Sequence, residues 1–219
     1  MKYLKQLASA LVASALLFGA APASAIVLLT FGQVGTGNTI TGTNNGAGST
    51  TISGANIAVT ITQIDAAVAT PIAAFLTLNA TSVGAAVLVA GNVVQTFSGT
   101  FSITSGATNF LSGTFSDSVF GAAGGAALTL SAAQPPDTVT FTSNVIAAGD
   151  LGLARGISFS FANVSPPVGI TGGSLSSFAS SVSGTFSGNV GTTVPEPATL
   201  GLLGLALAGL GFVRTRKQA

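Results

Sequence analysis

Few side chains between the two ends of the chain could carry out acid–base chemistry. They are four aspartates and one arginine: Asp65, Asp117, Asp137, Asp150 and Arg155. Glycosidases and aspartic proteases use two carboxylates held close together. Asp137 and Asp150 flank one predicted strand and the turn after it, so they are the pair that could approach each other. Such carboxylates are more often solvated loop residues, and we expect that role for both.

Other catalytic and metal-binding groups are scarce. The chain has no His and no Cys, and it has no Lys between residues 26 and 194. This excludes the Ser-His-Asp, Cys-His and Ser-Lys systems from that segment. Zinc is rarely held by carboxylates alone. A calcium site needs about six to eight oxygens; Asp117, Asp137, Asp150 and the asparagines could supply some, but no calcium-loop motif is present. We therefore predict no enzymatic activity, catalytic residue, cofactor or metal site.

Charge is unevenly distributed along the chain. The net charge of the whole chain is +1, but five of its six cations lie near the ends: Lys2, Lys5, Arg214, Arg216 and Lys217. Residues 26–194 have one cation against four carboxylates, a net charge of −3. Proteins bind nucleic acids through basic patches that neutralise phosphates, so we exclude a nucleic-acid partner.

The central segment alternates apolar residues with Ser and Thr, which predicts half-buried antiparallel strands. About eight strands follow from this pattern, over residues 57–61, 72–78, 83–90, 93–104, 111–119, 137–145, 157–161 and 178–190. Residues 36–53 predict a long loop or a weak edge hairpin. Residues 122–133 are the one helix candidate, and Gly124-Gly125 argues against it. We predict an all-β fold, an antiparallel β-sandwich of the jelly-roll type, with a solenoid as the alternative.

The pentapeptide Ser-Gly-Thr-Phe-Ser occurs three times, at residues 98–102, 112–116 and 183–187. The first two copies stand close enough in sequence to form a hairpin. Gly and Phe share one face of each copy. The Gly then leaves room for a neighbouring aromatic ring or permits a bend. We therefore interpret the motif as a strand feature and not as a binding site.

The N-terminus predicts a secretory signal peptide. Lys2 and Lys5 precede an apolar run over residues 7–20, which predicts a signal helix. Ala23 and Ala25 form a small-x-small cleavage site, so signal peptidase is expected to cut after Ala25. The central segment is then exported.

The C-terminus predicts a membrane anchor preceded by a rigid peptide. Pro195, Glu196 and Pro197 form an extended, exposed element because proline fixes its own φ and restricts the residue before it. Residues 198–213 are apolar and could form a short transmembrane helix. The basic residues after it favour a cytoplasmic C-terminus. They are Arg214, Arg216 and Lys217.

This order of Pro-Glu-Pro, apolar helix and basic tail resembles the PEP-CTERM sorting signal of Gram-negative bacteria. The resemblance implies that an exosortase-like membrane transpeptidase recognises Pro195, Glu196 and Pro197 and removes the helix. It also implies a surface or matrix protein of bacteria that make exopolysaccharide. The match covers only the C-terminal residues, so it implies little about the rest of the chain.

These observations predict three regions. Residues 1–25 form the signal peptide, residues 26–190 the β-sandwich ectodomain, and residues 191–219 the linker, sorting motif, transmembrane helix and basic tail. The precursor is expected in the inner membrane with a cytoplasmic C-terminus, and the processed protein at the cell surface or in the extracellular matrix. We predict a non-enzymatic protein of an exopolysaccharide or biofilm context.

A ligand-binding module at the cell surface is the alternative function. Hydroxyl rows such as Thr60-x-Thr62 and Thr138-x-Thr140-x-Thr142 could bind polysaccharide, calcium or ice. Flat, stacked threonine rows would favour ice or a polymer, and a twisted sheet would disfavour them. Proteins that bind sugars usually stack the sugar rings on Trp or Tyr, and residues 26–194 contain neither.

Overall fold

The computed structural model describes residues 25–37, 39–134, 136–152 and 154–189. The predicted signal helix, transmembrane helix and basic tail lie outside these residues. The described part contains thirteen strands and no helix, and hence no helix that could cross a membrane. The strands are β1 Ala25–Gln33, β2 Ile40–Gly46, β3 Ser49–Ile64, β4 Ile72–Ser82, β5 Val87–Val89, β6 Asn92–Ser105, β7 Thr108–Ala122, β8 Ala127–Ala133, β9 Val139–Thr142, β10 Gly156–Ser165, β11 Ile170–Thr171, β12 Ser174–Leu175 and β13 Phe178–Asn189.

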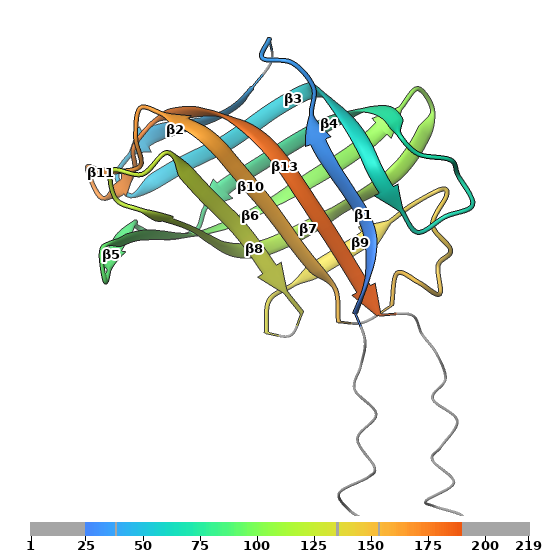
Figure 1. The fold of residues 1–219 in the computed structure, drawn as a ribbon. Helices are drawn as coiled ribbons and strands as arrows, with labels where there is room; N and C mark the ends of the chain where they lie inside the picture. Colours follow the sequence, from blue (N-terminus) through green and yellow to red (C-terminus); the bar gives the residue numbers. More distant parts are fainter. Residues whose placement is uncertain (1–24, 38, 135, 153, 190–219) are drawn as a thin grey trace, which may run out of the picture. The chain divides into compact units, whose positions relative to one another are not determined.

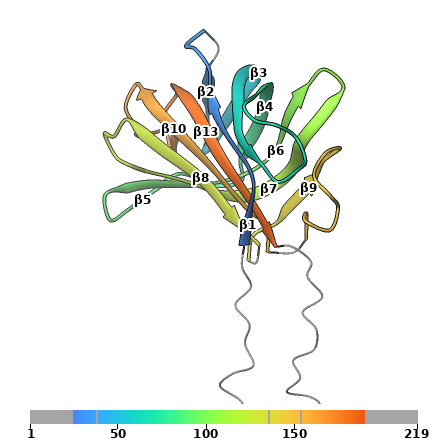
Figure 2. The same cartoon turned by 45° about the vertical axis from the view of Figure 1, so that its right-hand side comes forward.

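Eight strands pair into a closed antiparallel ring (Figures 1 and 2). Its order is β1, β3, β4, β6, β7, β8, β10, β13 and back to β1. The remaining strands of this sheet pair beside the ring. The short strand β5 pairs with β6, β9 pairs with β7, and β2 pairs with β3 and β13. Strands β11 and β12 form a separate two-stranded sheet. Closure leaves few open sheet edges.

The all-β, antiparallel class is confirmed, whereas the jelly-roll arrangement is not. Around the ring the strands follow one another in chain order, up and down. A jelly roll requires strands that cross over to the opposite sheet, and the ring described here contains none. Stacked solenoid repeats do not describe it either, because β1 pairs with β13 at the far end of the domain.

Phenylalanine rings fill the interior of the ring. Phe31, Phe97, Phe159 and Phe186 are almost completely buried. Phe101 stacks on Phe186 with ring centroids 4.7 Å apart, and Phe159 meets Phe186 edge-on at 5.5 Å. Aromatic pairs in these geometries add stability beyond the area they bury. Because the chain has no cysteine, packing of this kind replaces disulfide bonds.

The repeated pentapeptide behaves as predicted. Its first two copies lie in β6 and β7, which pair as a hairpin with Gly99 opposite Phe115 and Phe101 opposite Gly113. In the third copy, a Cβ added to Gly184 would lie 2.5 Å from Cε1 of Phe31. Glycine is therefore required at this position because an aromatic ring occupies the space of a side chain.

Four strands were not predicted from the sequence: β1, β8, β11 and β12. Strand β1 follows the signal peptide and contains the unbroken apolar run Val27-Leu28-Leu29, which shows no alternation. Residues 36–53, expected as a long loop or a weak edge hairpin, form β2 and the start of β3, which pair with each other, so the hairpin alternative is confirmed. Residues 127–133 form β8 inside the rejected helix candidate. The predicted strands 83–90 and 137–145 shrink to the three residues of β5 and the four of β9.

Candidate functional site

Most of the predicted processing residues lie outside the described part of the chain. They are Ala23, Pro195, Glu196, Pro197, Arg214, Arg216 and Lys217. Ala25 is described: it begins β1 and stands opposite Asn189, the last residue of β13. The predicted signal-peptidase site therefore borders the first strand of the sheet.

The chain enters and leaves the sheet at one end. Ala25 pairs with Asn189 and Ile26 with Gly188, so the start of β1 and the end of β13 lie side by side (Figure 1). Seven residues lead from Asn189, the last residue of β13, to Glu196. The segment that carries the Pro-Glu-Pro element therefore continues the chain from this end of the sheet.

Charged residues gather at the same end. The Asp65 amide donates to the Leu28 oxygen at 2.8 Å, and a Cβ on Gly188 would lie 2.8 Å from the Asp150 oxygen. Asp137 Oδ2 accepts a hydrogen bond from the Ala133 amide at 3.2 Å. Three of the four aspartates are thus placed toward the end of the sheet where Ala25 pairs with Asn189.

Arg155 binds main-chain oxygens in this region. Its Nε donates to the Leu151 oxygen at 2.9 Å, and its Nη1 to the Val139 oxygen at 3.1 Å. Among the described residues its guanidinium forms no ion pair with Asp150. The lone cation of the central segment has a structural role: it ties the loop before β10 to β9.

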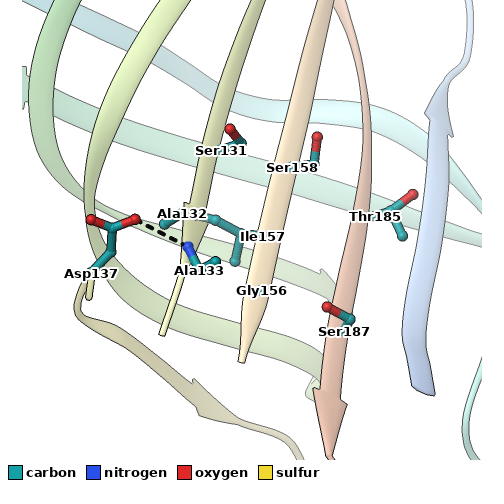
Figure 3. A pocket seen from close by; sticks show the side chains of 9 residues that line it. All are labelled: Ser131, Ala132, Ala133, Asp137, Gly156, Ile157, Ser158, Thr185 and Ser187. Carbon is teal, nitrogen blue, oxygen red and sulfur yellow. Dashed lines mark hydrogen bonds between the residues drawn. The ribbon is translucent and has the colours of Figure 1, made fainter. Parts of the chain in front are cut away.

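A shallow hollow of about 450 Å³ opens on the outer side of β8, β10 and β13 (Figure 3). Its polar lining consists of Ser131, Ser158, Thr185, Ser187 and Asp137. A glycosidase needs two carboxylates about 5–10 Å apart, and this lining offers one. Its serines have no histidine or lysine beside them to activate a nucleophile. The hollow therefore lacks the parts of a hydrolase site.

A continuous hydroxyl face covers the outer side of β4, β6, β7 and β9. We define it by the outward side chains Thr77, Asn79, Thr81, Ser98, Thr100, Ser102, Ser112, Thr114, Ser116, Thr140 and Thr142. The strand registers align them in rows across the sheet, for example Asn79, Thr100, Thr114 and Thr140. None of these side chains is charged. The predicted alternation of hydroxyls with apolar residues is confirmed here.

Neighbouring hydroxyls of this face bond to one another. Thr114 Oγ1 and Thr140 Oγ1 lie 2.8 Å apart, as do Ser112 Oγ and Thr142 Oγ1. The Thr138 amide donates to Ser116 Oγ at 3.2 Å. These contacts hold the hydroxyls of β7 and β9 in place, so the face presents fixed donors and acceptors.

Phe75 lies at the margin of the hydroxyl face and was missed from the sequence. It is 46% exposed, two residues before Thr77 on the outward side of β4, and pairs with Thr104 of β6. An exposed aromatic ring beside hydroxyls can contact the apolar side of a sugar ring. The sequence does contain a pattern that could have identified it, since Phe75, Thr77 and Asn79 stand two residues apart and therefore share one face of the strand. The apolar residues 72–74 just before them do not alternate with polar ones, so this pattern was not recognised.

The described part of the chain is thus an all-β domain whose first and last strands, β1 and β13, pair with each other in a closed sheet. Residues 193–217 match the family model of the PEP-CTERM protein-sorting motif. The chain therefore carries this motif, as its resemblance implied, and the match supports an exported protein sorted by an exosortase-type enzyme. The matched residues include the Pro-Glu-Pro element and all three C-terminal cations. No curated protein matches the chain, and no solved structure does.

Proposed function

We propose that this protein is a non-enzymatic component of the cell surface or extracellular matrix. Its C-terminal segment is recognised at Pro195, Glu196 and Pro197 and processed by an exosortase-like transpeptidase, in an exopolysaccharide or biofilm context. The observation that carries the proposal is the sorting motif at residues 193–217. The absence of His, Cys and Lys from residues 26–194 supports a non-catalytic role.

The geometry of the described domain suits this pathway. Because Ala25 and Asn189 are paired, signal peptidase and the sorting enzyme would both act at the same end of the sheet. The precursor would be anchored in the inner membrane, with Arg214, Arg216 and Lys217 in the cytoplasm. After processing, the closed sheet would leave the membrane with its hydroxyl face exposed.

Cell fractionation of the native host tests this pathway. A peptide tag placed after Ala219 is compared with an antibody against the folded domain. We expect the domain at the surface or in the matrix without the tag, and the tagged precursor in the membrane. The domain and the tag found together at the surface would contradict processing. The domain retained in the cytoplasm would contradict export.

Binding of a neutral polysaccharide is the second candidate function, and the hydroxyl face favours it. The face offers fixed hydroxyls, no charge and one exposed aromatic ring, Phe75. A calcium site would need carboxylates, which the face lacks. Ice would need a flat surface, whereas this sheet closes into a ring. A flexible, uncharged, hydroxyl-rich polymer is therefore the partner that fits best among those considered.

Affinity electrophoresis of the full chain tests this binding with dextran as the neutral polymer and alginate as the acidic one. We expect dextran to retard the protein more than alginate, and Phe75→Ala to remove most of the retardation. Phe120→Ala is the matched control, because Phe120 is also an exposed ring, at 52%, but stands outside the hydroxyl face. Equal loss in both variants, or retardation by alginate alone, would contradict this function.

A further inference from the structure

The short strand β5 departs from the pattern of the rest of the sheet. Its three residues are all apolar and all exposed: Val87 at 51%, Leu88 at 62% and Val89 at 54%. Next to it, Val87 pairs with Val94 of β6, which pairs with the exposed Phe120 of β7. Apolar side chains elsewhere in the strands mostly face the core. A contiguous exposed apolar patch of this kind marks an interaction surface.

One edge of β5 is open. Among the described residues it pairs only with β6, and it projects from the body of the ring (Figure 2). Natural sheet edges are usually protected by charges or proline. The sequence from Ala66 to Ser116 contains no charged residue, and its one proline, Pro71, lies outside β5. By contrast, the edge strand β9 is partly covered, because Arg155 donates to the Val139 oxygen.

The hydrogen bonding of β5 leaves Leu88 available. Ala90 and Gly91 form a two-residue turn in which φ is 48° for Ala90 and 82° for Gly91, as expected for a tight hairpin. The turn sets Val89 opposite Asn92 and Val87 opposite Val94. Main-chain groups alternate in direction along an antiparallel strand. Those of Val87 and Val89 therefore point at β6, and the N–H and C=O of Leu88 point at the open edge.

The β5 hairpin is held in place at its base and at its turn. The Ala86 amide donates to the Gly173 oxygen at 2.8 Å, and the Ala123 amide donates to the Gly91 oxygen at 3.0 Å. An edge fixed in this way loses little conformational entropy when it binds. Its partner strand β6 stands four places around the ring from β13.

We propose that β5 pairs with β5 of a second copy of this chain, antiparallel and centred on Leu88. The sequence Val87-Leu88-Val89 reads the same in both directions, so a two-fold axis through the strand pair sets Leu88 opposite Leu88 of the other copy. Each Val87 then stands opposite Val89 of the other copy. The two Leu88 residues exchange two main-chain hydrogen bonds. Such an interface is isologous and closes as a dimer.

Cysteine cross-linking tests this pairing in cells that export the full chain. Because the natural chain has no cysteine, a single Leu88→Cys variant reports only the new thiol. Directly paired residues have Cα atoms about 5.5 Å apart, within disulfide range. We expect a covalent dimer on a non-reducing gel after mild oxidation. The control is Val83→Cys, which is 65% exposed but lies outside β5.

Charge variants in the Leu88→Cys background test the antiparallel register. Val87→Lys with Val89→Lys sets like charges against each other, and we expect the cross-linked fraction to fall at least about tenfold. Val87→Lys with Val89→Glu sets opposite charges against each other only in the antiparallel register, so cross-linking should be retained. The circular dichroism spectrum of each purified variant shows whether the sheet still folds.

Three results would overturn the proposal. They are no covalent dimer from Leu88→Cys in the folded protein, equal cross-linking of Val83→Cys, and equal loss of cross-linking in the two charge variants. The proposal does not depend on processing of the C-terminal segment, because the cross-link forms whether or not that segment is removed.

Discussion

The closed sheet and the C-terminal segment are specified in different ways. The sheet uses many residues, and no curated protein or solved structure matches it. The C-terminal segment uses residues 193–217, and these match a family model. A half-buried strand needs only apolar residues alternating with polar ones. A processing enzyme reads particular side chains in a fixed order. Particular residues are therefore fixed where an enzyme must recognise the chain. Where only packing constrains the sequence, many different residues can satisfy the same apolar and polar pattern.

The largest effect is expected from substitutions in the Pro-Glu-Pro motif, which should stop processing without changing the stability of the sheet. Glu196→Gln, combined with Pro195→Ala and Pro197→Ala, should abolish C-terminal processing because both the carboxylate and the rigid backbone of the motif are lost. Immunoblots of exporting cells would show the unprocessed precursor accumulating. The thermal midpoint of the folded domain should not change.

Asp150→Asn is the matched control for that variant. It also removes one carboxylate, and Asp150 lies near Gly188 at the end of the sheet where the processing segment begins. Processing should remain normal. Loss of processing in Asp150→Asn would show that the processing enzyme depends on charge near the sheet and not on the motif itself.

The next largest effect is expected from a substitution in the core of the sheet, which should lower the stability of the domain and leave the sorting motif intact. In Gly184→Val the new side chain would meet Cε1 of Phe31 at 2.5 Å, so overpacking should lower the free energy of unfolding by about 3 kcal/mol. Gly32→Val is the control, because a Cβ there meets nothing within 4 Å. Urea unfolding of both variants measures the difference, and equal destabilisation would contradict the assigned packing.

A smaller loss is expected at Gln95, a buried polar residue on the core side of β6. Its Nε2 donates to the oxygens of Gly84 at 2.8 Å and Gly48 at 3.1 Å, and its Oε1 accepts from the Leu175 amide at 3.0 Å. Gln95→Met removes these three hydrogen bonds, and among the described residues only the Gly48 oxygen keeps another side-chain donor, Ser82 Oγ at 3.5 Å. The loss should cost about 2 kcal/mol in urea unfolding. The exposed neighbour substitution Thr96→Val should be nearly neutral.

The smallest effect concerns the hydroxyl face. Thr114→Val removes an exposed hydroxyl that bonds to Thr140 at 2.8 Å. Solvent can replace that bond, so we expect a change in unfolding free energy below about 1 kcal/mol. Thr100→Val, at a position of the same row on β6, is the comparison. A loss as large as that of Gln95→Met would mean that the face is part of the structural framework and is not a free surface.

The predictions from sequence succeeded where the pattern is local. The repeated Ser-Gly-Thr-Phe-Ser predicted the β6–β7 hairpin, because both strands and their turn lie within one short segment. The Pro-Glu-Pro motif was likewise found because its residues are consecutive. Both features can be read without knowing where the rest of the chain lies.

The ring itself could not be predicted, because alternation tells which side of a strand is buried and not which strand lies next to it. The pairing of Ala25 with Asn189 joins the two ends of the domain. Strand β1 was also hidden, since Leu28 and Leu29 are both buried although they are adjacent. Gln95 was unexpected because its partners come from three separate segments: Gly48 between β2 and β3, Gly84 between β4 and β5, and Leu175 of β12.

Intact-mass measurement of the protein recovered from the surface or matrix of its native host tests the central claim most directly. The account predicts a chain that begins at Ile26 and ends at or near Pro195–Pro197, without the apolar run and without Arg214–Ala219. A surface form whose mass extends to Ala219 would contradict processing at the sorting motif.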